Sequence, residues 1–179
     1  QAGQTRAVPP ALLIRHAALN DQADPQRMAV GIELIAAAED AGDIRILGAA
    51  HCNVGLDLQD GGSWNEAADH YHLGIKYADE LGDGYRKLFP TINLAAMQVD
   101  QGRWDEARPI LDEARRIAQH HRSGYTAAWA KSELGRLEVV AGRPTVGRPL
   151  LESALEWFTE AEIASDVFEL RVLLLAADL

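Results

Sequence analysis

The sequence predicts an all-α fold in which antiparallel helix hairpins stack one after another into a solenoid. Three similar segments, each opened by a glycine, recur at a spacing of forty residues. These segments are GSWNEAAD from Gly62, GRWDEARP from Gly102 and GRPTVGRP from Gly142. The stretches between them are rich in Ala, Leu, Glu and Arg, which favour helix. Because a unit that recurs at a fixed spacing is typical of repeat architectures, we interpret the segments as turns between helices and not as an active site.

Small and large residues occupy the same columns of these repeats. The position five residues after each turn glycine is small, and the position four residues further on is large. The two columns hold Ala67, Ala107 and Gly147, and Tyr71, Leu111 and Leu151. Spacings of three and four mark one face of a helix, and small residues let two helix backbones approach each other. The pattern therefore predicts helix hairpins, in which Ala107 and Ala114 lie where the helices come closest.

The first two hairpins differ in how well they follow the pattern. The first is degenerate, because Arg15, Gln22 and Arg27 stand where later repeats have small residues, as is common in a terminal repeat with one face toward solvent. The second has the turn residue Gly62, at which a positive φ costs glycine little, and Ser63, a favourable residue at the start of a helix. The predicted helices of these hairpins are residues 10–20, 25–41, 44–60 and 64–81.

The third and fourth hairpins complete the array and are followed by one terminal helix. Pro90 is the exception to the avoidance of proline in helix interiors, and we expect it in the first turns of its helix. Trp104 is expected to close its turn against the preceding helix, and Asp105 to lie in a first turn, where the helix dipole favours an acid. The predicted helices are residues 84–101, 104–121, 124–141, 146–162 and 165–178. We interpret residues 1–179 as a single repeat domain, with hairpins at about 10–41, 44–81, 84–121 and 124–162.

The composition is that of a folded protein without a membrane-spanning segment. Apolar runs such as VLLLAA, residues 172–177, are too short to cross a bilayer. A net charge of -10, with basic residues spread along the chain, makes direct contact with nucleic acid unfavourable. The single cysteine, Cys52, cannot form an internal disulfide, which fits a reducing cytoplasm. The chain starts with neither methionine nor a signal-peptide pattern, so we expect a fragment of a larger cytoplasmic protein.

The columns resemble the tetratricopeptide repeat, a helix-turn-helix unit with an apolar-Gly pair in its first helix and Ala followed by an aromatic in its second. The matching residues of the second hairpin are Val54, Gly55, Gly62, Trp64, Ala67 and Tyr71. Those of the next two are Leu94, Ala95, Gly102, Trp104, Ala107 and Leu111, and Leu134, Gly135, Gly142, Gly147 and Leu151. In the last, Pro144 replaces the tryptophan. The resemblance covers about residues 44–163 and implies a right-handed superhelix of about four repeats with a terminal helix.

The repeat of forty residues is longer than the common repeat of about thirty-four residues. In this respect it is similar to the repeats of bacterial LuxR-type transcription regulators and signal-transduction ATPases. The resemblance implies a non-enzymatic interaction module, serving as the sensory or scaffolding array of a bacterial transcriptional or signalling regulator. The partner that it implies is a protein or peptide, including another domain of the same chain.

Catalytic and metal sites are not predicted. The phosphate-binding pattern GxxxxGK[ST] does not occur in the sequence. Asp105 and Glu106 are adjacent and cannot share a helical face, and no two histidines have the i, i+4 spacing that brings two imidazoles to one ion. We therefore predict no catalytic residue, no metal and no cofactor. Two alternatives stay open: an all-α enzyme whose site is built from dispersed carboxylates and histidines, and a homo-oligomer whose groove is filled by a neighbour's helix.

Five residues on the first helices of the hairpins are predicted to line a binding groove. In the family these helices face the concave side, and an asparagine in the column of Asn53 and Asn93 commonly holds the main chain of a ligand. The amide suits this role because it both donates and accepts hydrogen bonds. The predicted groove residues are Asn53, Phe89, Asn93, Trp129 and Arg136. An aromatic, weakly charged groove favours an apolar or helical ligand over an acidic tail. The alternative is that the two asparagines only tie adjacent hairpins together.

Overall fold

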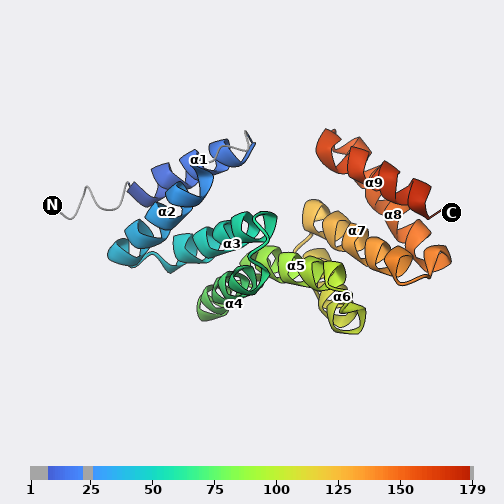
Figure 1. Ribbon diagram of the computed structural model, residues 1–179, viewed down its shortest axis with the longest axis horizontal. Coiled ribbons are helices and arrows are strands. Elements are labelled where there is room, and N and C mark those ends of the chain that lie inside the picture. Colours follow the sequence, from blue (N-terminus) through green and yellow to red (C-terminus); the bar gives the residue numbers. More distant parts are fainter. Residues whose placement is uncertain (1–7, 22–25, 178–179) are drawn as a thin grey trace. The chain divides into compact units, whose positions relative to one another are not determined.

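The computed structural model describes residues 8–21 and 26–177, and their regular structure is entirely helical (Figure 1). The described residues contain no β-strand, so the all-α prediction is confirmed. The helices are α1 (Val8–Asp21), α2 (Arg27–Ala41), α3 (Ile44–Asp60), α4 (Trp64–Glu80), α5 (Gly84–Asp100), α6 (Trp104–His120), α7 (Gly124–Val140), α8 (Pro144–Glu160) and α9 (Ala164–Ala176). Within the described ranges, no helix has the length and apolarity that crossing a membrane requires.

The observed helix ends lie close to the predicted ones. From α3 to α7 every helix begins at the predicted residue and ends within one residue of the predicted end. Helix α8 begins at Pro144, two residues earlier than predicted, because proline is well suited to the first helical position, where no backbone N–H is needed. Three sequence predictions lie outside the described residues: the small-column position Gln22, the start of the second helix at residue 25 and the end of the last helix at residue 178.

Proline occurs inside three helices, whereas the sequence analysis expected only Pro90 there. Pro90 lies inside α5, and Pro109 and Pro149 lie inside α6 and α8. The last two are forty residues apart and each is the sixth residue of its helix. At that position a proline removes only one backbone hydrogen bond close to the helix start, so the helix continues. The expectation of a single exception was therefore wrong.

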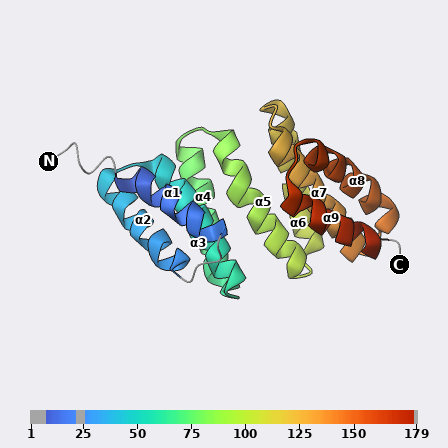
Figure 2. The same cartoon turned by 90° about the horizontal axis from the view of Figure 1, so that it is seen from above.

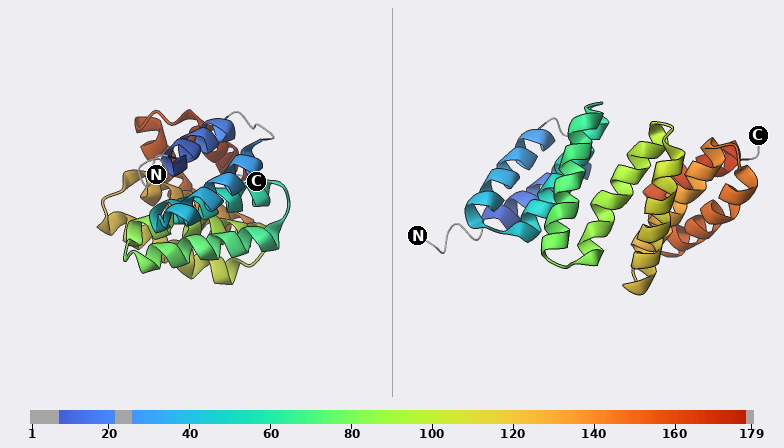
Figure 3. Two further views of the ribbon diagram at one scale, coloured as in Figure 1. Left: turned by 90° about the vertical axis from the view of Figure 1, so that its left-hand side faces the viewer. Right: turned by 90° about the horizontal axis from the view of Figure 1, so that it is seen from below.

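The chain divides into two compact units, Gln1–Pro90 (unit 1) and Thr91–Leu179 (unit 2). In unit 1, α1, α2, α3 and α4 pack consecutively (Figure 2). A core cluster that includes Leu12, Val30 and Leu34 joins the first three of them. In unit 2, α6, α7, α8 and α9 pack consecutively (Figure 3), and a core cluster that includes Leu151 and Phe158 joins the last three of them. Each unit is thus a stack of neighbouring helices, which confirms the helical-repeat architecture. The prediction of a single domain stays a prediction.

The small columns lie where helix backbones approach most closely. A Cβ atom added at Gly55 of α3 would be 2.7 Å from Cε1 of Tyr71 on α4. A Cβ added at Gly147 of α8 would be 2.5 Å from the carbonyl oxygen of Gly135 on α7. Ala107 is fully buried and Ala114 is 1% exposed, as expected for small residues at a helix contact. The hairpin interpretation of the columns is confirmed.

A buried carboxylate joins α6, α7 and the start of α8 in unit 2. Glu138 of α7 has a side chain that is 3% exposed, and it pairs with Arg108 of α6 and with Arg143, the residue that precedes α8. The Arg143 Nε lies 2.6 Å from Glu138 Oε2.

The indole of Trp104 forms a hydrogen bond across the turn between α5 and α6. Its Nε1 donates to the carbonyl oxygen of Val99 at 3.2 Å. The prediction that Trp104 closes its turn against the preceding helix is confirmed.

The turn that follows helix α6 contains a residue in the left-handed conformation that is not glycine. Arg122 has φ 54°, whereas Gly82, forty residues earlier, has φ 63° in the same place. The Arg122 N–H bonds to the Gln119 carbonyl and the Ser123 N–H to the Ala118 carbonyl, each at 3.0 Å. These are the two hydrogen bonds of a Schellman motif, a helix ending that normally uses glycine. The chain therefore accepts strain at Arg122 to keep the same turn.

The packing at Ala107 predicts the effect of enlarging that side chain. Ala107→Leu adds three carbon atoms to a position with no exposed surface, so it should overpack the contact and lower the free energy of unfolding by about 1 to 3 kcal/mol. Urea unfolding measures the change. The control is Ala36→Leu on α2, an exposed alanine at which we expect a change within about 0.5 kcal/mol. An unchanged stability of the Ala107 variant would show that the buried face is wrongly assigned.

The backbone at Arg122 predicts a stabilising substitution. Arg122→Gly should raise the free energy of unfolding by about 0.5 to 1 kcal/mol, because glycine adopts a positive φ without the steric cost that a side chain carries there. The reverse change, Gly82→Arg, should lower the free energy of unfolding. A Cβ added at Gly82 has no atom within 4 Å, so no steric clash would mask the backbone effect. Thermal unfolding of both variants checks the pair. Equal signs for the two would contradict a backbone origin.

Candidate functional site

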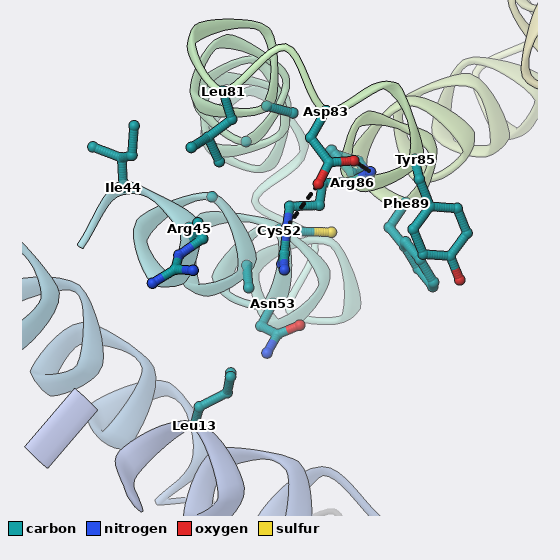
Figure 4. A pocket seen from close by; sticks show the side chains of 15 residues that line it. Leu13, Ile44, Arg45, Cys52, Asn53, Leu81, Asp83, Tyr85, Arg86 and Phe89 are labelled. Atoms are coloured by element: carbon teal, nitrogen blue, oxygen red, sulfur yellow. Dashed lines mark hydrogen bonds and ion pairs between the residues drawn. The ribbon is translucent and has the colours of Figure 1, made fainter. Parts of the chain in front are cut away.

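An apolar pocket with a volume of about 380 Å³ lies within unit 1 (Figure 4). It is lined by α1, α3, α4 and the first part of α5. Its floor consists of small residues on α3 and α4, namely Gly48, Ala49, Cys52, Gly74 and Ala78. Because these side chains are short, the hollow above them stays open although the helices below are in close contact.

The pocket brings together two of the five predicted groove residues. Asn53 of α3 and Phe89 of α5 both line it, and both are half-buried. Tyr85 lies one turn before Phe89, and the two rings meet edge to face with centroids 6.0 Å apart. Leu13 of α1 faces the hollow from the opposite side (Figure 4). The result is an aromatic wall, an apolar floor and an amide that can both donate and accept hydrogen bonds.

The charged groups at the pocket are paired within their own helices. Asp43 caps α3 by accepting hydrogen bonds from the Arg45 and Ile46 N–H groups at 3.1 and 3.2 Å, and its Oδ1 lies 3.6 Å from Arg45 Nε. Asp83 caps α5 in the same way, with Oδ1 3.0 Å from the Arg86 N and Oδ2 3.0 Å from the Arg86 Nε. Each arginine is thus matched by an aspartate at the start of its helix.

The other three predicted residues lie in unit 2. Trp129 of α7 is half-buried and packs against the core cluster that contains Leu151 and Phe158, and Asn93 of α5 is also half-buried. The remaining residue, Arg136 of α7, is held by contacts within unit 2. Its guanidinium pairs with Asp100 and Glu133 and donates to the Ala96 carbonyl at 3.1 Å.

Arg136 is the positively charged partner of two carboxylates, those of Asp100 and Glu133. Burial raises the pKa of Glu133 above its usual range, while Arg136 acts in the opposite direction. The arginine joins α7 to the second part of α5 through Asp100. The prediction that all five residues line one groove stays a prediction.

Two histidines that the sequence left unassigned are paired in unit 1. Nδ1 of His51 on α3 lies 3.1 Å from Nδ1 of His70 on α4, and the His51 ring stacks on Tyr77 with centroids 5.7 Å apart. Burial, followed by the proximity of His70, lowers the pKa of His51 to about 4. In the part of the chain that the structure describes, no three histidine, cysteine or carboxylate side chains are placed to hold a metal ion.

A buried ionic network connects the first three helices. His16 Nε2 of α1 lies 2.9 Å from Asp57 Oδ2 of α3, and Arg27 Nε of α2 lies 2.6 Å from Asp57 Oδ1. Arg27 also pairs with Asp60 at 2.8 Å. His16 is 1% exposed and Asp57 is 7% exposed, so the pair is sealed from solvent. The presence of Arg27 where later repeats have small residues was a sequence signal for this network, although nothing indicated its partners.

The histidine pair predicts how stability depends on pH. Because the folded-state pKa of His51 lies below the ordinary 6.5, the unfolded chain binds more protons between about pH 6.5 and 4. The contribution of His51 therefore lowers the free energy of unfolding as the pH falls through this window, by at most about 1.4 kcal/mol per pH unit. Urea unfolding at several pH values should give a smaller slope for His51→Gln. The control, His72→Gln, changes an exposed histidine and should keep the slope of the unmodified protein. Equal slopes in all three proteins would rule out His51 as the titrating group.

Comparison with known proteins relates this chain to others by fold. No protein-family model matches the chain, and no curated protein sequence matches it. Among solved structures it is similar to the crystal structure of BtubC (BKLC) from P. vanneervenii, with a TM-score of 0.60 and 15% sequence identity. The match covers 99% of this chain and 87% of that chain. At this identity the likeness concerns the fold, and the two chains share an all-helical, repeat-like architecture.

Proposed function

We propose that this chain is a non-enzymatic binding module and that the unit 1 pocket is part of its binding surface. The observation that carries the proposal is the pocket itself, whose lining includes Asn53 and Phe89, two of the five predicted groove residues. A concave apolar site with an aromatic wall and few polar groups is the usual composition of a ligand pocket.

The buried ionic groups support binding over catalysis. A catalytic His–Asp pair must reach its substrate, but His16 and Asp57 are 1% and 7% exposed and are held between α1, α2 and α3. The exposed charges at the pocket, Arg45 and Arg86, are paired with the capping aspartates of their helices. These contacts support structural roles for the groups from which an all-α enzyme would have to build its site.

The repeat columns support the finer assignment to a tetratricopeptide-like module of a bacterial transcriptional or signalling regulator. The support is the forty-residue unit with its close contacts at Gly55, Gly135 and Gly147. A partner protein or peptide, including another domain of the same chain, would then bind along the first helices of the hairpins. A cytoplasmic location is part of the proposal and rests on the single cysteine, Cys52.

The proposal is tested by measuring binding and stability on the same variants. A chain with p-benzoyl-L-phenylalanine in place of Phe89 should crosslink to its partner under ultraviolet light, and the purified partner then serves for titration. Phe89→Ala should weaken that complex by about 2 kcal/mol, because an aromatic anchor is lost, and Asn53→Ala by about 1 kcal/mol.

The control for this measurement is Phe168→Ala on α9, which removes an aromatic ring that is 73% exposed and does not line the pocket. We expect the control to bind as the unmodified chain does. If Phe89→Ala lowered the melting temperature but left the affinity of the folded protein intact, Phe89 would be a core residue and the proposed site would be refuted. Equal losses for the two phenylalanine variants would also remove the pocket as the binding site.

A further inference from the structure

The pocket exists because one column of the repeat changes size in unit 1. The column holds Ala49, Phe89 and Trp129, so the second hairpin has a methyl group where the next two have aromatic rings. Ala49 and Phe89 both line the pocket, and the Phe89 ring lies beside that of Tyr85 (Figure 4). The hollow therefore occupies space that a larger side chain in this column would fill.

The volume of the hollow suits a small molecule. Apolar cavities of about 150 Å³ hold benzene, and ligand pockets commonly enclose roughly 300 to 1,000 Å³. The pocket, at about 380 Å³, has room for two or three rings or an aliphatic group of similar size. The flat faces of Tyr85 and Phe89 favour a planar or cyclic body, since aromatic rings pack well edge to face or offset.

The electrostatics of the pocket favour a ligand without charge. Arg45 and Arg86 are the cations that line it, and each is paired with the aspartate that caps its own helix. An anionic ligand would have to compete with Asp43 and Asp83, and a cationic ligand would have to lie beside the two arginines. Burying a charge without a partner is costly, whereas an uncharged group loses little on entering the apolar floor.

We infer that the unit 1 pocket binds an uncharged, largely apolar small molecule with a cyclic body and one hydrogen-bonding group, and that it discriminates against anions. Asn53 supplies the polar contact, because its amide pairs equally with a hydroxyl, a carbonyl or an N–H group. The inference rests on the proposed function, because each of the two proposals makes this pocket a binding site. It goes further by assigning the chemical class of the ligand.

Two fluorescent dyes with the same ring system test the ligand class. N-phenyl-1-naphthylamine is uncharged, and 8-anilino-1-naphthalenesulfonate is the same skeleton with one sulfonate. In fluorescence titrations the unmodified protein should bind the uncharged dye at one site, at least about ten-fold more tightly than the sulfonate, because the sulfonate meets already paired arginines. Equal or tighter binding of the sulfonate, or no binding of the uncharged dye, would overturn the inference.

Variants locate the dye and test the role of the ion pairs. Ala49→Phe places in the hollow the residue that the next repeat carries there, and should weaken the uncharged dye at least about ten-fold. Its control is Ala36→Phe at an exposed position of α2, which should bind as before. Phe89→Ala, which removes part of the wall, provides a second variant if Ala49→Phe is not folded by circular dichroism. Dye affinity that is unchanged in both pocket variants would place the dye elsewhere and refute the site.

The variant Asp83→Asn removes the negative charge beside Arg86 while keeping a side chain of nearly the same size at the pocket. Asparagine caps a helix as well as aspartate does, so the α5 start is kept while Arg86 loses its carboxylate partner. The sulfonate dye should then bind several-fold more tightly, and the uncharged dye should be unaffected. No gain for the sulfonate would refute the explanation by paired arginines.

The outcomes distinguish this inference from the proposed function. If the uncharged dye does not bind while Phe89→Ala still weakens the crosslinked protein partner, the module binds protein and the small-molecule inference fails. If the dye binds in the pocket and the partner is insensitive to Phe89→Ala, the pocket is a small-molecule site, and its proposed role in partner binding fails.

Discussion

The close approach of the paired helices in the hairpins α3–α4 and α7–α8 is the constraint on which the rest of the structure depends. An added Cβ at Gly147 would lie 2.5 Å from the carbonyl oxygen of Gly135 on the paired helix. At Gly55 and Gly135 it would lie 2.7 Å from the side chain of Tyr71 or Leu151, so the helices or those side chains would have to move. Because such contacts recur at the repeat spacing, they set where each helix lies against the next. The side chains of α3 that line the pocket, including Asn53, take their positions from the contact of α3 with α4.

Two buried carboxylates add specific connections to this apolar packing. Asp57 joins α1, α2 and α3 through His16 and Arg27. Glu138 joins α7 to α6 through Arg108 and to the N-cap residue of α8, Arg143. Burying these charges costs desolvation energy that their partners offset, so removal of one partner would leave a strongly unfavourable group in the core. Each network connects three successive parts of its unit, whereas an apolar contact between two helices connects only those two.

The pocket lies where one column of the repeat departs from its usual residue type. The next two hairpins have Phe89 and Trp129 in this column, whereas Ala49 contributes only a methyl group to the pocket lining. The capping aspartates that start α3 and α5 also neutralise the nearby arginines, so residues needed for helix initiation set the electrostatic character of the pocket. The same few residues therefore start the helices and determine the charge at the pocket.

The sequence by itself determined the helices, their boundaries and the faces on which they pack, because these follow from local propensity and from spacings of three, four and forty residues. It also placed Asn53 and Phe89 on the first helices of their hairpins. Only the tertiary structure decided that these two share a pocket, that His51 meets His70, and that Asp57 pairs with His16 and Arg27. Those contacts join single residues far apart in the chain, and no periodicity marks them. The hollow likewise depends on how four helices come together in space, which a repeat pattern read along one chain does not contain.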